Sequence, residues 1–87
     1  MPRISAFFGI IIYIYFDDVG QHHAPHIHAR YGEYVAVFSI EDGRILAGHM
    51  KGKQTRRVRR WINKRRAELE ANWQRALNGE QLQWIEP

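Results

Sequence analysis

Cysteine is absent from the sequence, which excludes disulfide bonds and thiolate metal sites. Long apolar runs are absent too, since the run over residues 6–16 is shorter than the roughly 20 residues that a membrane-spanning helix needs. The N-terminal residues also lack the basic segment, apolar core and small-residue cleavage site of a secretory signal. These absences predict a soluble, cytoplasmic protein that does not enter a membrane.

Acidic residues are missing from one segment of the chain. Residues 51–66 contain nine lysines and arginines and no aspartate or glutamate, whereas residues 1–50 and 67–87 each carry more acidic than basic side chains. The net charge of +4 for the whole chain conceals this separation. A concentrated positive patch on an otherwise mildly acidic protein favours a polyanionic ligand or an acidic protein partner.

The rest of the composition is that of one small domain over residues 1–87. Apolar residues make up 45% of the chain, which is enough for a hydrophobic core, and no repeat or linker divides it. Apolar and alternating runs between turn residues predict strands at about 4–16, 26–31, 34–41 and 44–50. Gly9 interrupts the first of these runs, and we interpret it as a bulge or as a point of close approach in a strand that is buried on both faces.

A helical pattern follows the predicted strands. We expect Thr55 to be the N-cap of a helix over about 56–78, with Gly79 as its left-handed C-terminal cap. Residues 82–86 are expected to form a packed tail or a short edge strand. The buried stripe of the helix is predicted to consist of Val58, Trp61, Ile62, Leu69, Trp73, Ala76 and Leu77. The elements together predict an α+β fold, an antiparallel sheet of three to five strands with one long C-terminal helix packed on one face.

The lengths of the two expected hairpin loops decide which residues face the helix. If residues 32–33 and 42–43 are two-residue loops, the strands alternate in a definite register, in which Ala36 pairs with His49. The more aromatic face, which contains Phe38 and would also contain His49, is then expected to lie under the helix.

Four of the five histidines lie within residues 22–28. In the same register His28 pairs with Val37, and His26 and His28 lie together on the face away from the helix, about 6–7 Å apart along the strand. A three-residue loop at Gly32 would turn this pair toward the helix instead.

The histidine cluster suggests two kinds of chemistry. The pKa of histidine lies near neutrality, so His26 and His28 could act as base and acid in metal-independent RNA cleavage, with Arg30 and the arginine-rich helix stabilising the phosphate charge. Alternatively, His23, His26, His28 and Asp17 offer imidazole and carboxylate ligands for a divalent transition metal such as zinc or nickel. A polar, solvated sheet face without chemistry is the third interpretation, and the sequence does not decide among them.

The basic segment supplies the residues that we predict to bind an anion. Cations in the first turn of a helix oppose its dipole, and a helix selected for stability alone would carry acidic residues there. The predicted contacts to RNA or to an acidic partner are Arg30, Arg56, Arg57, Arg59, Arg60 and Lys64. The alternative is a solvated face on which the arginine stems cover the core.

Short motifs occur along most of the chain. They are Tyr15-Phe16-Asp17-Asp18, His23-Ala24-Pro25-His26-Ile27-His28-Ala29, Tyr31-Gly32-Glu33-Tyr34, Ile40-Glu41-Asp42-Gly43, Gly48, Trp61, Trp73 and Ile85-Glu86-Pro87. In these motifs the chain resembles the short bacterial proteins of the family called domain of unknown function 4160. Ala24 stands where that family has a further proline, and His22 is an additional histidine. The resemblance implies no established activity, but it implies a small partner protein from a neighbouring gene, as in toxin–antitoxin pairs.

We therefore expect a toxin-like component of a two-gene pair that binds RNA through a basic helix, with histidine-based cleavage as a further expectation. The alternatives are a non-enzymatic adaptor that binds an acidic protein partner, and a metal-binding protein built on the histidine cluster. Salt-dependent RNA binding, with or without cleavage, separates these functions.

Overall fold

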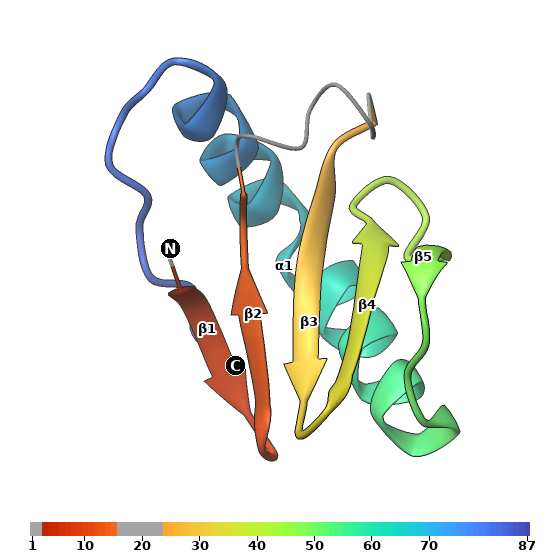
Figure 1. The fold of residues 1–87 in the computed structure, drawn as a ribbon. Coiled ribbons are helices and arrows are strands. Elements are labelled where there is room, and N and C mark those ends of the chain that lie inside the picture. The colour runs from red at the N-terminus through yellow and green to blue at the C-terminus, as the bar shows by residue number, and fades with distance from the viewer. Residues whose placement is uncertain (1–2, 16–23) are drawn as a thin grey trace.

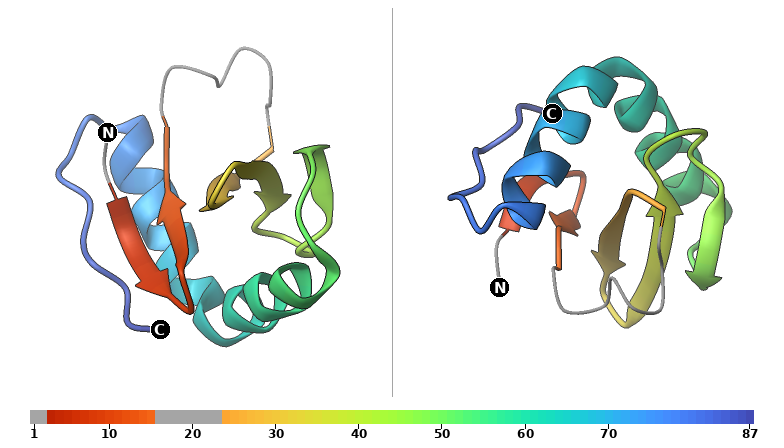
Figure 2. Two further views of the ribbon diagram at one scale, coloured as in Figure 1. Left: turned by 60° about the horizontal axis from the view of Figure 1, so that its bottom comes forward. Right: turned by 90° about the horizontal axis from the view of Figure 1, so that it is seen from above.

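Five strands form one antiparallel sheet in sequence order in the computed structural model, which describes residues 3–15 and 24–87. The strands are β1 (Arg3–Phe7), β2 (Ile10–Tyr13), β3 (His26–Tyr31), β4 (Tyr34–Ser39) and β5 (Ile45–Gly48). One long helix, α1 (Gly52–Leu77), follows them and crosses a single face of the sheet (Figures 1 and 2). This arrangement confirms the predicted α+β fold.

The first predicted strand is in fact a hairpin of two strands, so Gly9 is a turn residue and not a bulge. Its close approach to a neighbour is confirmed, because a Cβ atom there would lie 3.3 Å from the ring of Tyr31. Phe8 and Gly9 form the turn between β1 and β2, and both have left-handed backbone angles, with φ of 50° and 77°. Two such residues in succession suit the tight turns that join twisted antiparallel strands. The sequence hid this turn because apolar residues continue through it without the usual polar turn signal.

The helix begins at Gly52, four residues earlier than predicted, and ends at Leu77. Lys51 occupies the N-cap position and makes no side-chain capping bond. Thr55 is therefore not the cap; it lies inside the first turns, where its hydroxyl donates to the carbonyl of Lys51 at 2.9 Å. A side-chain bond of this kind within a helix cannot be distinguished from a cap by sequence. Gly79 has the predicted left-handed conformation, with φ of 70°.

The core lies between α1 and the sheet. Val58, Trp61, Ile62, Leu69 and Trp73 of the predicted stripe are buried, whereas Leu77 in the last turn is exposed. The buried residues of the stripe pack against buried strand residues that include Ile10, Ile12, Ile27 and Phe38. Each large side chain that is fully buried here stabilises the fold by about 2 kcal/mol. Within the described part of the chain, no helix is long and apolar enough to cross a membrane.

The hairpin of β3 and β4 has the predicted two-residue loop. Tyr31 pairs with Tyr34 across it, and His28 pairs with Val37. Gly32 occupies the first loop position with φ of 59°, a conformation that glycine adopts without strain. The predicted register of these two strands is confirmed.

The predicted register of β4 and β5 was wrong. Ala36 pairs with Gly48 and not with His49. Two features cause the difference. The amide of Ser39 donates to the carbonyl of Arg44 at 2.9 Å, so four residues lie in the turn between them instead of two. The pairing then shifts by one residue between Phe38 and Val37, where Phe38 pairs with Ile45 and Val37 with Ala47. His49 is consequently exposed at the end of the strand and does not face the helix.

One carboxylate stabilises this wider turn. The backbone N–H of Arg44 donates to Asp42 at 3.0 Å, and this bond, more than the nearby guanidinium, holds the pKa of Asp42 below its ordinary value of 3.8. The hydrogen bond therefore stabilises the turn fully at pH values above the ordinary pKa of Asp42. This stabilisation is lost as the pH falls through the lowered pKa of the folded protein.

Residues 78–87 return along β1 and cover that edge of the sheet (Figure 1). Ile85 is buried, and its amide donates to the carbonyl of Ile4 at 2.8 Å. The side chain of Asn72, which is fully buried, forms hydrogen bonds of 2.8 and 3.0 Å to the backbone of Gln83. One backbone bond to β1 does not make a strand, so the packed tail is the correct one of the two predicted alternatives.

Candidate functional site

The structure divides the predicted site residues between two faces of the molecule. Ala29 is buried in the core under α1, and neighbouring residues of a strand point to opposite faces. His28 and Arg30 therefore lie on the sheet face away from the helix. The predicted arginines of residues 56–60, in contrast, lie on α1 itself.

His26 and His28 lie close together, with ring centroids 5.4 Å apart. His26 is fully buried and not part of an open face, because its ring also contacts Trp73 of α1 at 4.9 Å. Its Nδ1 lies 2.8 Å from the carbonyl oxygen of Ala24. A carbonyl oxygen can only accept, so Nδ1 carries a proton and donates it in this hydrogen bond. A backbone carbonyl orients histidine in this way in many catalytic and metal sites, and in structural positions as well.

Two tyrosines that the sequence analysis did not select extend this pair. The ring of Tyr15 meets the edge of His28 at a centroid distance of 4.3 Å, and Tyr13 stacks on Tyr15 at 5.7 Å. The result is a row of five rings in contact, formed in order by Tyr13, Tyr15, His28, His26 and Trp73. The available signal was the alternation of isoleucine and tyrosine in residues 12–15, which the assumption of a strand buried on both faces concealed.

The metal prediction is tested only in part by this geometry. His26 and His28 come together, whereas His23 and Asp17 lie outside the described residues. Among residues 3–15 and 24–87, no group of three or more histidine, aspartate or glutamate side chains could hold a metal ion. Two imidazoles alone fall short of the three or four protein ligands of a zinc site. Metal binding by the cluster stays a prediction.

The cations of α1 form an exposed and uncompensated face. Arg56, Arg60 and Lys64 are exposed, and Arg57 is half-buried. Of the nine cations in residues 51–66, Arg65 alone has an acidic partner among the described residues, Glu68 at 3.2 Å. The first turn of the helix contains no acidic residue.

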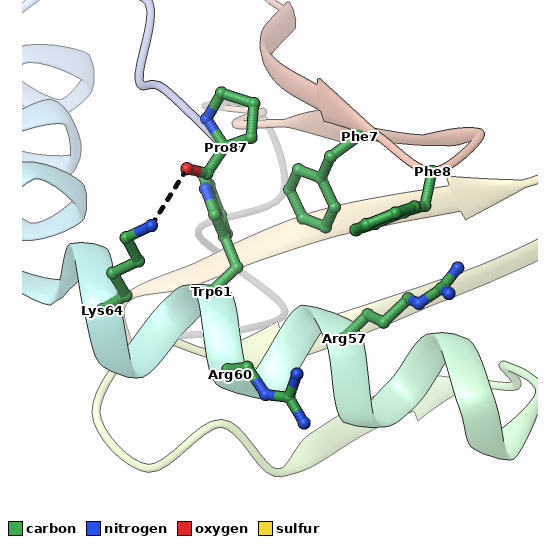
Figure 3. A pocket seen from close by; sticks show the side chains of 7 residues that line it. All are labelled: Phe7, Phe8, Arg57, Arg60, Trp61, Lys64 and Pro87. Carbon is green, nitrogen blue, oxygen red and sulfur yellow. Dashed lines mark hydrogen bonds between the residues drawn. The ribbon is translucent and has the colours of Figure 1, made fainter.

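Two arginines of this segment have structural roles. The Nε of Arg59 donates to the carbonyl of Gly43 at 2.9 Å and attaches α1 to the turn after β4. The Nε of Arg66 donates in the same way to the carbonyl of Ile40 at 2.9 Å. Lys64 also has a backbone partner, because its Nζ donates to the carbonyl of Pro87 at 3.5 Å (Figure 3). Arg59 and Lys64 are therefore members of the predicted anion-binding set that the fold itself helps to position.

A groove of about 280 Å³ lies between α1 and the hairpin of β1 and β2 (Figure 3). Its apolar wall consists of the rings of Phe7, Phe8 and Trp61. Its remaining lining residues are Arg57, Arg60, Lys64 and Pro87. Sequence reasoning found the cations but not the two phenylalanines, because it placed them inside a buried strand.

The groove and the histidine pair lie at opposite ends of the sheet. His26 is the first residue of β3, whereas Tyr31, the last, pairs with Ile10 beside the Phe8-Gly9 turn. At about 3.3 Å per residue, the five steps of β3 span about 17 Å. The structure thus does not bring the predicted catalytic histidines and the cations of the groove into one site.

Comparison with known proteins identifies a family and no activity. No curated protein and no solved structure matches the chain. The family model described as "Domain of unknown function (DUF4160)" matches residues 9–74, which include the histidine pair and the cations of α1. The resemblance inferred from the motifs is thereby confirmed, and the chain belongs to the DUF4160 family.

Proposed function

We propose that the protein binds single-stranded RNA along the basic face of α1. The observation that supports this most strongly is the charge of residues 51–66, where nine cations have one acidic partner in the described part of the chain. Cations on successive turns repel one another, and Lys53 in the first turn also opposes the helix dipole. A bound polyanion removes both costs, so these residues suit binding better than they suit folding.

Arginine and the neighbouring aromatic rings favour RNA over an acidic protein as the ligand. The guanidinium groups of Arg56, Arg57 and Arg60 can each donate two parallel hydrogen bonds to one phosphate. Phe8 and Trp61 lie beside these cations in the groove, and proteins that bind single strands combine cations with aromatic rings in this way. The toxin-like role and the small partner from a neighbouring gene, which the resemblance implies, belong to the same proposal.

The test is the salt dependence of binding to a short single-stranded RNA, measured by fluorescence anisotropy. Each phosphate contact is expected to contribute about −0.7 to the slope of log affinity against log salt concentration. Contacts from Arg56, Arg57, Arg60 and Lys64 then give a slope of about −3. Binding that does not depend on salt would contradict the proposal, and binding of an acidic peptide without binding of RNA would favour the adaptor alternative.

A second candidate function is RNA cleavage by the histidine pair, supported by the contact of His26 with His28 at 5.4 Å. General acid–base catalysis contributes about 100-fold or more to a rate, so His28→Ala should reduce cleavage by at least that factor. RNA affinity should change little, because His28 lies on the other face of the sheet. The matched control is His49→Ala, which replaces an exposed histidine that lies beside Tyr34. Cleavage at the normal rate by His28→Ala would eliminate this candidate and leave RNA binding untouched.

A further inference from the structure

Phe8 occupies a position that does not favour phenylalanine. Its backbone φ is 50°, in the left-handed region where residues other than glycine and asparagine are strained. Its ring is 68% exposed, so little burial of the ring offsets that strain. Folding stability therefore does not account for this residue, and strain at an exposed aromatic residue points to a function.

Arg57 covers one face of the exposed ring. Its guanidinium carbon lies 4.0 Å from the centroid of Phe8, within the range of a cation–π contact, and Figure 3 shows the ring lying flat above the arginine. Since the ring is mostly exposed, its other surface is accessible to a ligand. The turn thus presents a flat aromatic surface with a positive charge directly behind it.

The floor of the groove is apolar and already ordered. Phe7 packs against Trp61 with ring centroids 5.2 Å apart. The indole N–H of Trp61 donates to the carbonyl of Glu86 at 2.9 Å, so this ring offers the groove an apolar surface and no free donor. A volume of about 280 Å³ lies at the lower end of the range for small-molecule sites, which begins near 300 Å³. The space suits one planar ring system and not an extended ligand.

We infer that the mouth of this groove receives one unpaired base of a single-stranded polynucleotide, which stacks on the face of Phe8 that Arg57 leaves uncovered while Arg57, Arg60 and Lys64 contact the adjoining phosphates. The cations explain why the ligand is anionic, and the exposed ring explains why it carries a planar group. An acidic peptide would use the same cations but would leave the strained Phe8 without a role. The inference rests on the proposed function and adds to it a site that binds a base of the nucleic acid as well as its phosphate backbone.

The experiment compares Phe8→Gly with the wild-type protein on two probes, a short single-stranded RNA and an abasic strand of the same length and charge. Stacking on an aromatic ring changes affinity by about tenfold per base, so Phe8→Gly should weaken RNA binding by about that factor. The slope of log affinity against log salt should not change, because no cation is removed. Affinity for the abasic strand should be equal in the two proteins. The unfolding midpoint should be unchanged or higher, because glycine relieves the left-handed strain.

Trp84→Ala is the matched control, because Trp84 is also an exposed aromatic residue, at 53%, but does not line the groove. It should bind RNA like the wild type. Tight, salt-dependent RNA binding by Phe8→Gly would overturn the base site and leave the proposed function standing. Failure of the wild type to bind either strand would overturn both. A lower unfolding midpoint in Phe8→Gly would show a structural role for the ring and would also overturn the inference.

Discussion

Replacing Gly48 by alanine is expected to destabilise the protein by about 3 kcal/mol. Gly48 has φ of 81°, where a residue with a Cβ atom is already strained by about 1 kcal/mol. The added Cβ would also collide with the carbonyl oxygen of Val35 and lie 3.0 Å from the Cα of Ala36. Both are backbone atoms of β4, and Ala36 is the strand partner of Gly48, so relief requires that the two strands separate. A loss of this size is a large part of the 5–15 kcal/mol that holds a typical domain folded.

Gly32→Ala is the control for this prediction. Gly32 also has a left-handed backbone, with φ of 59°, but an added Cβ would have no atom within 4 Å. Its substitution should therefore cost only the backbone strain, about 1 kcal/mol. Urea denaturation followed by circular dichroism measures both losses. Equal losses in the two variants would show that the collision with β4 is relieved at no cost, contrary to the prediction.

The parts of the fold that were predicted correctly depend on signals within single elements. The burial of Trp61 and Trp73 follows from their helical spacing, and both are 4% exposed. The register of β3 and β4 follows from the short loop at Gly32. The turn at Phe8-Gly9 was not predictable in the same way, since its first residue is a phenylalanine. The register of β5 depended on a four-residue turn and on a one-residue register shift beside Val37, neither of which the sequence indicated.

The candidate site shows the same division. The contact between His26 and His28 follows from alternation along one strand, so the sequence could predict it. The separation of this pair from the helix cations depends on which face and which end of the sheet α1 covers, and no local pattern determines that. The groove is formed by the β1–β2 turn and the middle of α1, some fifty residues apart in the chain, so Phe8 could be connected with Arg57 only in three dimensions.

Replacing Arg56, Arg57 and Arg60 together by glutamine is expected to weaken RNA binding by about 100-fold at 0.1 M salt. Three lost phosphate contacts reduce the magnitude of the slope of log affinity against log salt concentration by about 2. Over the tenfold range from about 0.1 M to 1 M salt, a slope difference of this size corresponds to a difference of about 100-fold in affinity. The fold should stay intact, because Arg56 and Arg60 are exposed and Arg57 packs on the exposed ring of Phe8.

The control for this triple variant removes the same charge elsewhere, by glutamine at Arg3, Arg44 and Arg75. Arg3 lies on β1, Arg44 lies in the turn between β4 and β5, and Arg75 lies in the last turn of α1, where it contacts Asn72 and no part of the groove. If binding is localised at the N-terminal half of the helix, this variant keeps a slope near that of the wild type, because distant charges act only through the screened field of the whole protein. Equal losses of slope in the two triple variants would mean that net charge alone attracts the RNA. The localised interface on α1 would then be wrong, even though the protein binds RNA.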